Sequence, residues 1–177
     1  MPHRFAGVVA ANTALPGLPN LASEIAPDAL GAFLGWLQWS QERHELRPSE
    51  IVGGVSPLNQ TRHTLTDGER AAYDAPFPDE SYCAGARQFP ILVPLDDVDP
   101  PASMLRAAWV GLEQFERPFV TAFAEHDDIA PFFDKIFRDR VPGARGRPHQ
   151  PIPNAGHFLQ EHAPDQLVEI ILALGNE

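Results

Sequence analysis

The stretch 117–128 reads RPFVTAFAEHDD, an apolar run that follows an Arg-Pro pair and ends in acidic residues. Its segment 119–123 is a candidate strand. The run 5–13, FAGVVAANT, is a further apolar run without alternation, which is typical of a strand covered on both faces of a parallel sheet, and it breaks into a loop rich in Pro and Gly. These two strands, with helical patterns between and after them, predict an α/β protein.

Further elements are expected on the carboxyl side of this stretch. Apolar spacing in 132–140, FFDKIFRDR, predicts an amphipathic helix, and a weak third strand near 150–153 leads into His157. A closing helix is expected with Pro164 in its first turn. Its predicted buried face consists of Leu167, Ile170, Ile171 and Leu174.

On the amino side, residues 21–102 contain no comparable strand. Apolar residues at helical spacing from Leu30 to Leu37 predict a helix, for which Asp28 is a candidate N-cap. Thr66 to Glu69 has the form of a capping box, and Asp79 could cap a further helix. We therefore expect short helices joined by loops, and the 19 prolines punctuate them.

Composition excludes several classes of function. The net charge of −11 argues against a nucleic-acid partner, because such partners are bound largely through Lys and Arg. No apolar run approaches the roughly 18 residues that a membrane helix needs, and the N-terminus does not read as a secretory signal, so a cytoplasmic protein is expected. Cys83 is the single cysteine, which excludes an internal disulfide.

Two loops that follow predicted strands carry groups able to do chemistry. Asp127 lies in one and His157 in the other, and the carboxyl ends of parallel strands meet at one edge of a sheet. A carboxylate bonded to one ring nitrogen would leave the other nitrogen as a general base. The alternative is a solvated turn and an ordinary loop histidine. The remaining histidines that lack a patterned partner are expected at the surface: His3, His44, His63, His149 and His162.

A metal site is a competing interpretation, because Glu125, His126 and Asp127 are all ligand types. Adjacent residues rarely converge on one ion, and no HExxH pattern occurs. A nucleophile is also missing, since no strand-to-helix elbow of the form G-x-[Ser/Cys/Asp]-x-G is found. Gly31 and Gly35 have the spacing, but Phe33 stands between them.

Three strings give the chain a resemblance to a known family. They are RFAGVVAANTALP at 4–16, AAYDAPFPDESYCAGARQFPILVP at 71–94, and AGHFLQE at 155–161. On these strings the chain resembles the haloalkane dehalogenases, which are α/β-hydrolases, over nearly its whole length. The resemblance implies an incomplete α/β-hydrolase fold, with a helical cap and the last three parallel strands and their helices.

The resemblance also implies a mechanism, in which an Asp nucleophile displaces halide from a haloalkane and a histidine activates water to hydrolyse the resulting ester. His157 matches that base and Asp127 the acid that orients it. Many relatives have proline next, where this chain has Asp128, so the choice between Asp127 and Asp128 stays open. The implied partners are a small halogenated alkane, water and halide, with no cofactor or metal.

The same resemblance divides the chain into core strand six and its loop (1–20), the cap (21–102) and the C-terminal core (103–177). Trp36 aligns with a cap tryptophan that holds the leaving halide, with Trp39 as the neighbouring alternative. The residues expected to line the substrate pocket are Phe33, Phe77, Pro78 and Ile129.

Relatives carry five strands and the nucleophile ahead of the part that matches here. Met1 is thus expected to be either an internal methionine or the start of a truncated gene. The chain alone should be inactive, and the open edge of the strand at 5–13 should favour self-association. Two other functions stay open: an epoxide hydrolase, in which Tyr73 and Tyr82 would polarise the epoxide, and a noncatalytic interaction module.

Overall fold

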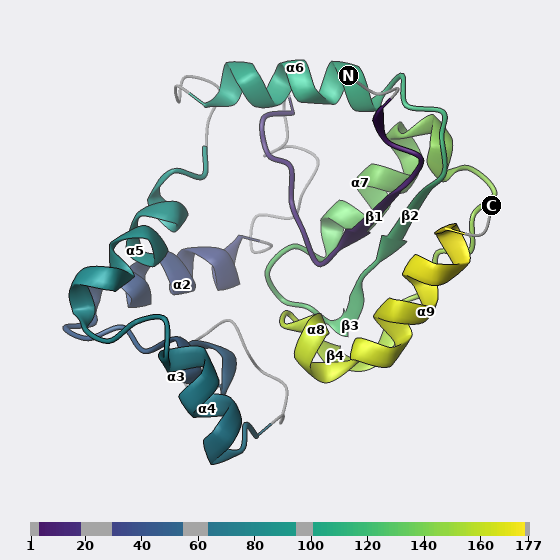
Figure 1. Ribbon diagram of the computed structural model, residues 1–177. Coiled ribbons are helices and arrows are strands. Elements are labelled where there is room, and N and C mark those ends of the chain that lie inside the picture. The colour runs from purple at the N-terminus through teal and green to yellow at the C-terminus, as the bar shows by residue number, and fades with distance from the viewer. Residues whose placement is uncertain (1–3, 19–29, 55–63, 95–100, 176–177) are drawn as a thin grey trace.

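The predicted parallel strands are present in the computed structural model, which describes residues 4–18, 30–54, 64–94 and 101–175. Strand β1 (Val8–Ala11) pairs in parallel with β2 (Phe119–Ala122), and β3 (Ala124–His126) pairs in parallel with β4 (Ile152–Gly156). Figure 1 shows the four strands together, and only Phe123 separates β2 from β3. The α/β class is therefore confirmed.

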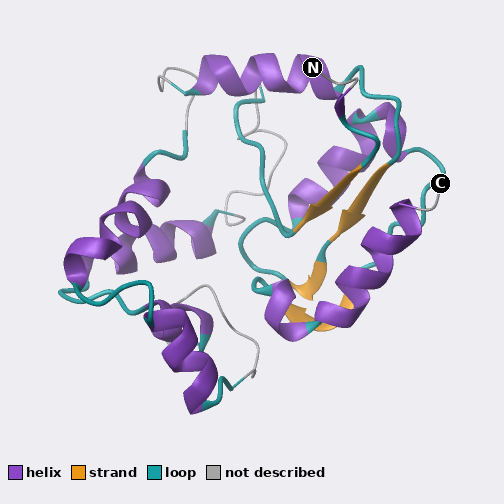
Figure 2. Cartoon of the chain, viewed as in Figure 1, coloured by secondary structure: helices purple, strands orange, loops and turns teal. Residues whose placement is uncertain are grey.

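Helices cover the strands on both faces, as the apolar runs predict. Successive residues of a strand point to opposite faces. Val8 and Ala10 pack with α6 (Ala102–Leu112) and α7 (Phe132–Arg140), while Val9 and Ala11 pack with α8 (Leu159–His162) and α9 (Pro164–Gly175). Figure 2 shows these strands in orange among the purple helices. A strand enclosed in this way has no polar face, which explains the missing alternation.

The largest core cluster in the described residues is aromatic. The ring of Phe137 lies 5.5 Å from that of Trp109 and 5.6 Å from that of Phe119, measured between centroids. The indole Nε1 of Trp109 donates to the carbonyl of Leu15 at 2.8 Å, so its polar atom is satisfied. Gly143, in the 3-10 helix η3 (Pro142–Ala144), sits so close that a Cβ would lie 1.8 Å from the carbonyl oxygen of Arg117.

Residues 30–54 and 64–94 contain helices and no strand in the described part. The helices are α2 (Gly31–Glu42), α3 (Pro48–Val52), α4 (Asp67–Asp74), the 3-10 helix η2 (Glu80–Cys83) and α5 (Ala84–Ile91). Both bonds of the capping box between Thr66 and Glu69 are present, and Asp79 accepts the Ser81 N–H at 2.9 Å. Asp28, the expected cap of α2, lies outside the described residues.

Two sequence expectations need correction. The third strand begins later and runs further than predicted, from Ile152 to Gly156. Ile171, expected on the buried face of α9, is 49% exposed. Leu167 and Ile170 face the core at helical spacing, whereas Val168, Ile171 and Leu172 form a second apolar stripe on the outside of α9. No helix in the described residues is long and apolar enough to cross a membrane.

Candidate active site

Asp127 and His157, which lie 30 positions apart in the sequence, meet at the carboxyl ends of β3 and β4. The His157 Nδ1 and the Asp127 Oδ1 are 2.9 Å apart. The side chain of Asp127 has no exposed surface, and that of His157 is 21% exposed. The structure thus brings together the pair that the strand pattern predicts.

The surroundings of Asp127 fix the roles of the two ring nitrogens. Its Oδ1 also accepts the backbone N–H of Ile129 at 3.1 Å. A carboxylate can only accept, so the Nδ1 of His157 carries the hydrogen and Nε2 is left as an acceptor. Asp128 is exposed. Of the two adjacent acids, Asp127 is therefore the one that contacts His157.

The second oxygen of Asp127, Oδ2, is buried and has no hydrogen-bond partner among the described residues. An unpaired buried carboxylate oxygen costs free energy in a folded protein. The acid is therefore only partly satisfied by the residues that surround it here.

Asn12 forms hydrogen bonds to the backbone close to Asp127 and His157, and sequence reasoning assigned it no role. Its Nδ2 donates to the carbonyls of Gly156 and His157, both at 2.9 Å, and its Oδ1 accepts the Ala124 N–H at 2.7 Å. Its φ of +37° lies in the left-handed region, which Asn tolerates better than most residues. An Asn directly after an apolar strand run is the signal that could have found it.

An apolar cavity of about 330 Å³ lies beside His157. Phe33 and Ile129, two of the four predicted pocket residues, line it. Val93 and Phe133 also line it. Its walls therefore come both from the helical stretch, residues 30–54 and 64–94, and from the part of the chain that carries β2 to β4. An apolar cavity with one imidazole at its wall suits a small apolar substrate and a base.

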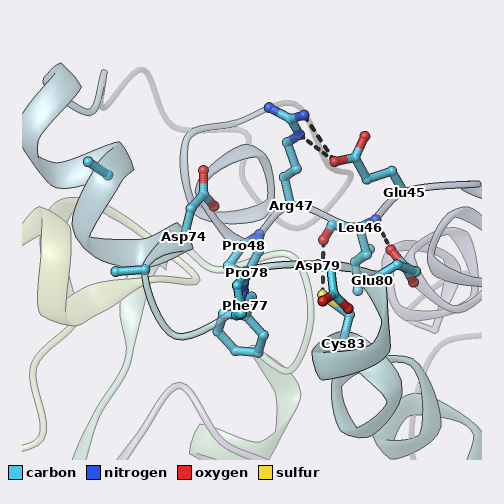
Figure 3. Close-up of a pocket in the computed structure, with 12 residues that line it drawn as sticks. Glu45, Leu46, Arg47, Pro48, Asp74, Phe77, Pro78, Asp79, Glu80 and Cys83 are labelled. Carbon is cyan, nitrogen blue, oxygen red and sulfur yellow. Dashed lines mark hydrogen bonds and ion pairs between the residues drawn. The ribbon is translucent and has the colours of Figure 1, made fainter.

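Phe77 and Pro78, the other two predicted pocket residues, line a different cavity of about 410 Å³, which Figure 3 shows. They follow α4, and the Phe77 N–H donates to the carbonyl of Asp74 at 2.9 Å. The acids around this cavity are bound to protein groups. Asp74 accepts from the N–H and hydroxyl of Ser49, and Glu80 from the N–H of Leu46.

Trp36, the expected halide donor, is buried but does not line the cavity beside His157. Its ring stacks on Trp39 at 5.5 Å between centroids, and it forms a core cluster with Leu46 and Cys83. Ile129 packs against the same cluster, so Trp36 belongs to the layer behind the cavity wall. Helix α2 thus places Phe33 at the cavity and Trp36 in this cluster.

Two histidines expected at the surface are half-buried and bound to backbone. The Nδ1 of His149 accepts the Thr121 N–H at 3.2 Å, and its Nε2 lies 2.7 Å from the carbonyl of Ala144. The Nδ1 of His162 accepts the Gly156 N–H at 2.9 Å. His44 is exposed as predicted, and His3 and His63 lie outside the described residues.

The competing metal interpretation gains no support from the arrangement of the acidic turn. Glu125 and His126 are exposed, while Asp127 is buried against His157. Among the residues that the structure describes, no group of three potential ligands converges on one point.

A hydrogen bond joins the helical residues 64–94 to the segment after His157. The hydroxyl of Tyr73, in α4, donates to the carboxylate of Glu161, in α8. Burial, followed by this hydrogen bond, raises the pKa of Tyr73 to about 12. Tyr73 therefore stays a donor across the physiological range.

Comparisons with known proteins give a consistent group of relatives. The chain is 40% identical over 171 residues to a haloalkane dehalogenase of Psychrobacter cryohalolentis, covering 97% of this chain and 52% of that protein. It is 37% identical over 172 residues to one of Mycolicibacterium paratuberculosis, covering 97% and 53%. The chain thus spans about half the length of these curated relatives. No protein-family model matches.

Among solved structures, the chain resembles haloalkane dehalogenase DbeA from Bradyrhizobium elkani, with a TM-score of 0.64. The match covers 97% of this chain and 60% of that one, at 18% identity, and therefore shows the fold alone.

Proposed function

This chain is related in sequence to the haloalkane dehalogenases and fits the C-terminal part of their α/β-hydrolase fold, and on that premise we propose its function. It supplies the histidine, the orienting acid and part of the substrate pocket of an enzyme that hydrolyses carbon–halogen bonds in small haloalkanes. The nucleophilic carboxylate comes from polypeptide outside these 177 residues.

The reaction has two steps. In the first, a carboxylate oxygen bonds to the halogen-bearing carbon, and the carbon–halogen bond breaks as halide leaves with its electron pair. In the second, the Nε2 of His157 takes a proton from water, whose oxygen adds to the carbonyl carbon of the ester. The ester bond then breaks, the alcohol leaves with the proton from the imidazolium, and the remaining proton of the water passes to solvent as the carboxylate is restored. Asp127 stabilises the imidazolium that forms in between.

One observation carries the proposal: the 2.9 Å contact between His157 and the fully buried Asp127, at the wall of an apolar cavity. The contact orients the ring, and the cavity limits competing water. Phe33 and Ile129 would contact the alkyl part of the substrate, because both line the cavity with His157.

The test compares the chain alone with the same chain joined to the part of a relative that it does not match. The purified chain should release no bromide from 1-bromobutane above background, because no nucleophile starts the first step. Joined to the part of the Psychrobacter relative that it does not match, it should release bromide continuously. Bromide release by the chain alone, abolished by His157→Ala, would contradict the proposal.

The helical stretch is proposed to act as a cap, with boundaries at 21–102 between core segments 1–20 and 103–177. Support comes from Phe33 in α2 and Val93 just after α5, which both line the cavity of His157. Trp36 would reach a halide only if α2 shifts when the enzyme is completed. The open edge of β1 and the apolar stripe on α9 are proposed to make the isolated chain self-associate.

An epoxide hydrolase is the less favoured alternative. That chemistry would require tyrosine hydroxyls at the cavity, and the chain has two tyrosines. Tyr73 donates to Glu161, and Tyr82 is 58% exposed. Neither lines the cavity beside His157, so the dehalogenase proposal is preferred. A noncatalytic module would not require the contact between Asp127 and His157.

A further inference from the structure

The turn that carries His157 is anchored by side chains from two directions in the sequence. Asn12, from the end of β1, binds the carbonyls of Gly156 and His157. His162, six positions after Gly156, returns to accept the Gly156 N–H at 2.9 Å. Three backbone groups next to His157 are thus held by two side chains.

The contact of His162 adds to the two bonds from Asn12 and to the bond from the Leu159 N–H to the His157 carbonyl at 2.9 Å. Helix α8 spans four residues, a length at which helical hydrogen bonds alone are marginal. Gly156 is buried, and a buried N–H that loses its acceptor carries a desolvation penalty. The imidazole of His162 accepts a hydrogen bond from this N–H and so connects α8 to the end of β4.

We propose that His162 is a positioning residue, which directs the ring of His157 toward Asp127 through the Gly156 backbone. The inference rests on the proposed function for the role of His157 as base. His162 does not line the cavity, so it acts through the backbone and does not touch substrate. Because its Nδ1 accepts an N–H, this nitrogen carries no proton and the neutral ring keeps its hydrogen on Nε2.

A matched pair of variants isolates the acceptor. His162→Asn keeps an acceptor, since Oδ1 stands at the same position along the side chain as the imidazole Nδ1. His162→Leu has nearly the shape of Asn and no acceptor. His44→Leu, at an exposed histidine, controls for the loss of an imidazole.

The first measurement uses the 177-residue chain and amide hydrogen exchange in residues 152–158. We expect the Gly156 amide to exchange about tenfold faster in His162→Leu, because one hydrogen bond is lost. His162→Asn and His44→Leu should stay within about twofold of the unmodified chain. Unchanged exchange in His162→Leu would overturn the inference.

The second measurement reports on His157 itself. The Nδ1–H proton of His157, bonded to Asp127, should give a low-field NMR resonance that is lost or moved upfield in His162→Leu and retained in His162→Asn. A resonance that is the same in both variants would overturn the inference, because a purely structural effect of His162 would not depend on the acceptor.

The joined enzyme distinguishes this inference from the proposed function. His162→Leu should slow hydrolysis of the ester and leave the first release of bromide unchanged, since His157 acts only in the second step. Hydrolysis at the unmodified rate in His162→Leu would contradict the role of His162. Absence of bromide release in every version would contradict the proposed function alone, and the His157 resonance would then decide the role of His162.

Discussion

Asp127 and His157 depend on a third residue, Asn12, whose carboxamide uses both of its ends. Two carbonyls accept from its Nδ2 and one N–H donates to its Oδ1, which fixes the orientation of the amide. A carboxylate of the same shape could accept but not donate. Asn12 is therefore a sensitive point for the geometry of the site.

We expect Asn12→Asp to lower the free energy of unfolding by about 1–3 kcal/mol at neutral pH, because two carbonyls lose their donor and face a negative oxygen. Urea unfolding measures this change. Asn154→Asp is the matched control, since Asn154 also has a left-handed φ, of +57°, but is exposed. Equal losses in the two variants would show that the hydrogen bonds of Asn12 contribute nothing specific.

The sequence predicts the central pair of the site but not the positions of several other residues. The order of strands and turns was sufficient to pair Asp127 with His157, because parallel strands deliver their ends to one edge. It could not place Trp36 relative to the cavity, because the sequence does not say how α2 is rotated about its axis. Nor could it place Phe77 and Pro78, which lie in the loop between α4 and η2. The contacts of His149 and His162 could not be predicted because most of their partners are backbone N–H and carbonyl groups, which leave no mark in the sequence.

Helices α4 and α8 are joined by the bond from Tyr73 to Glu161. The pKa of Tyr73 is raised from 10.0 to about 12 in the folded chain. An unfolded tyrosine therefore loses its proton at a lower pH than the folded one. The stabilisation linked to this shift is fully present below pH 10 and is lost as the pH rises toward 12.

Tyr73→Phe should remove this dependence on pH. We expect the urea midpoint of the unmodified chain to fall more steeply between about pH 9.5 and 11.5 than that of Tyr73→Phe. Tyr82→Phe, which removes the hydroxyl of an exposed tyrosine, should behave like the unmodified chain. Parallel falls in the unmodified chain and Tyr73→Phe would mean that the two helices are not coupled through this hydroxyl.

At the scale of the whole molecule, the chain leaves apolar surface uncovered. In the described residues β1 pairs on one side only, and Val168, Ile171 and Leu172 of α9 are 52%, 49% and 60% exposed. Such surfaces favour association. The composition of the chain could not reveal this open surface, because composition does not record which faces of a strand or helix are covered.

If the stripe on α9 contributes to association, Leu172→Lys should increase the fraction of monomer in sedimentation velocity at micromolar concentration. Gln166→Lys adds the same charge at an exposed polar position of the same helix and should change little. A wild-type chain that is monomeric throughout would exclude the proposed self-association, and equal effects of the two lysines would exclude the stripe as its site.

The central claim, that His157 acts as the base of the second step while the nucleophile lies outside this chain, is tested most directly by rapid-mixing measurement of bromide release. In the chain joined to the unmatched part of the Psychrobacter relative, His157→Gln should release one bromide per active site and then stop, because the alkyl ester forms but is not hydrolysed. Continued turnover of the His157→Gln protein at the rate of the unmodified joined protein would contradict the account.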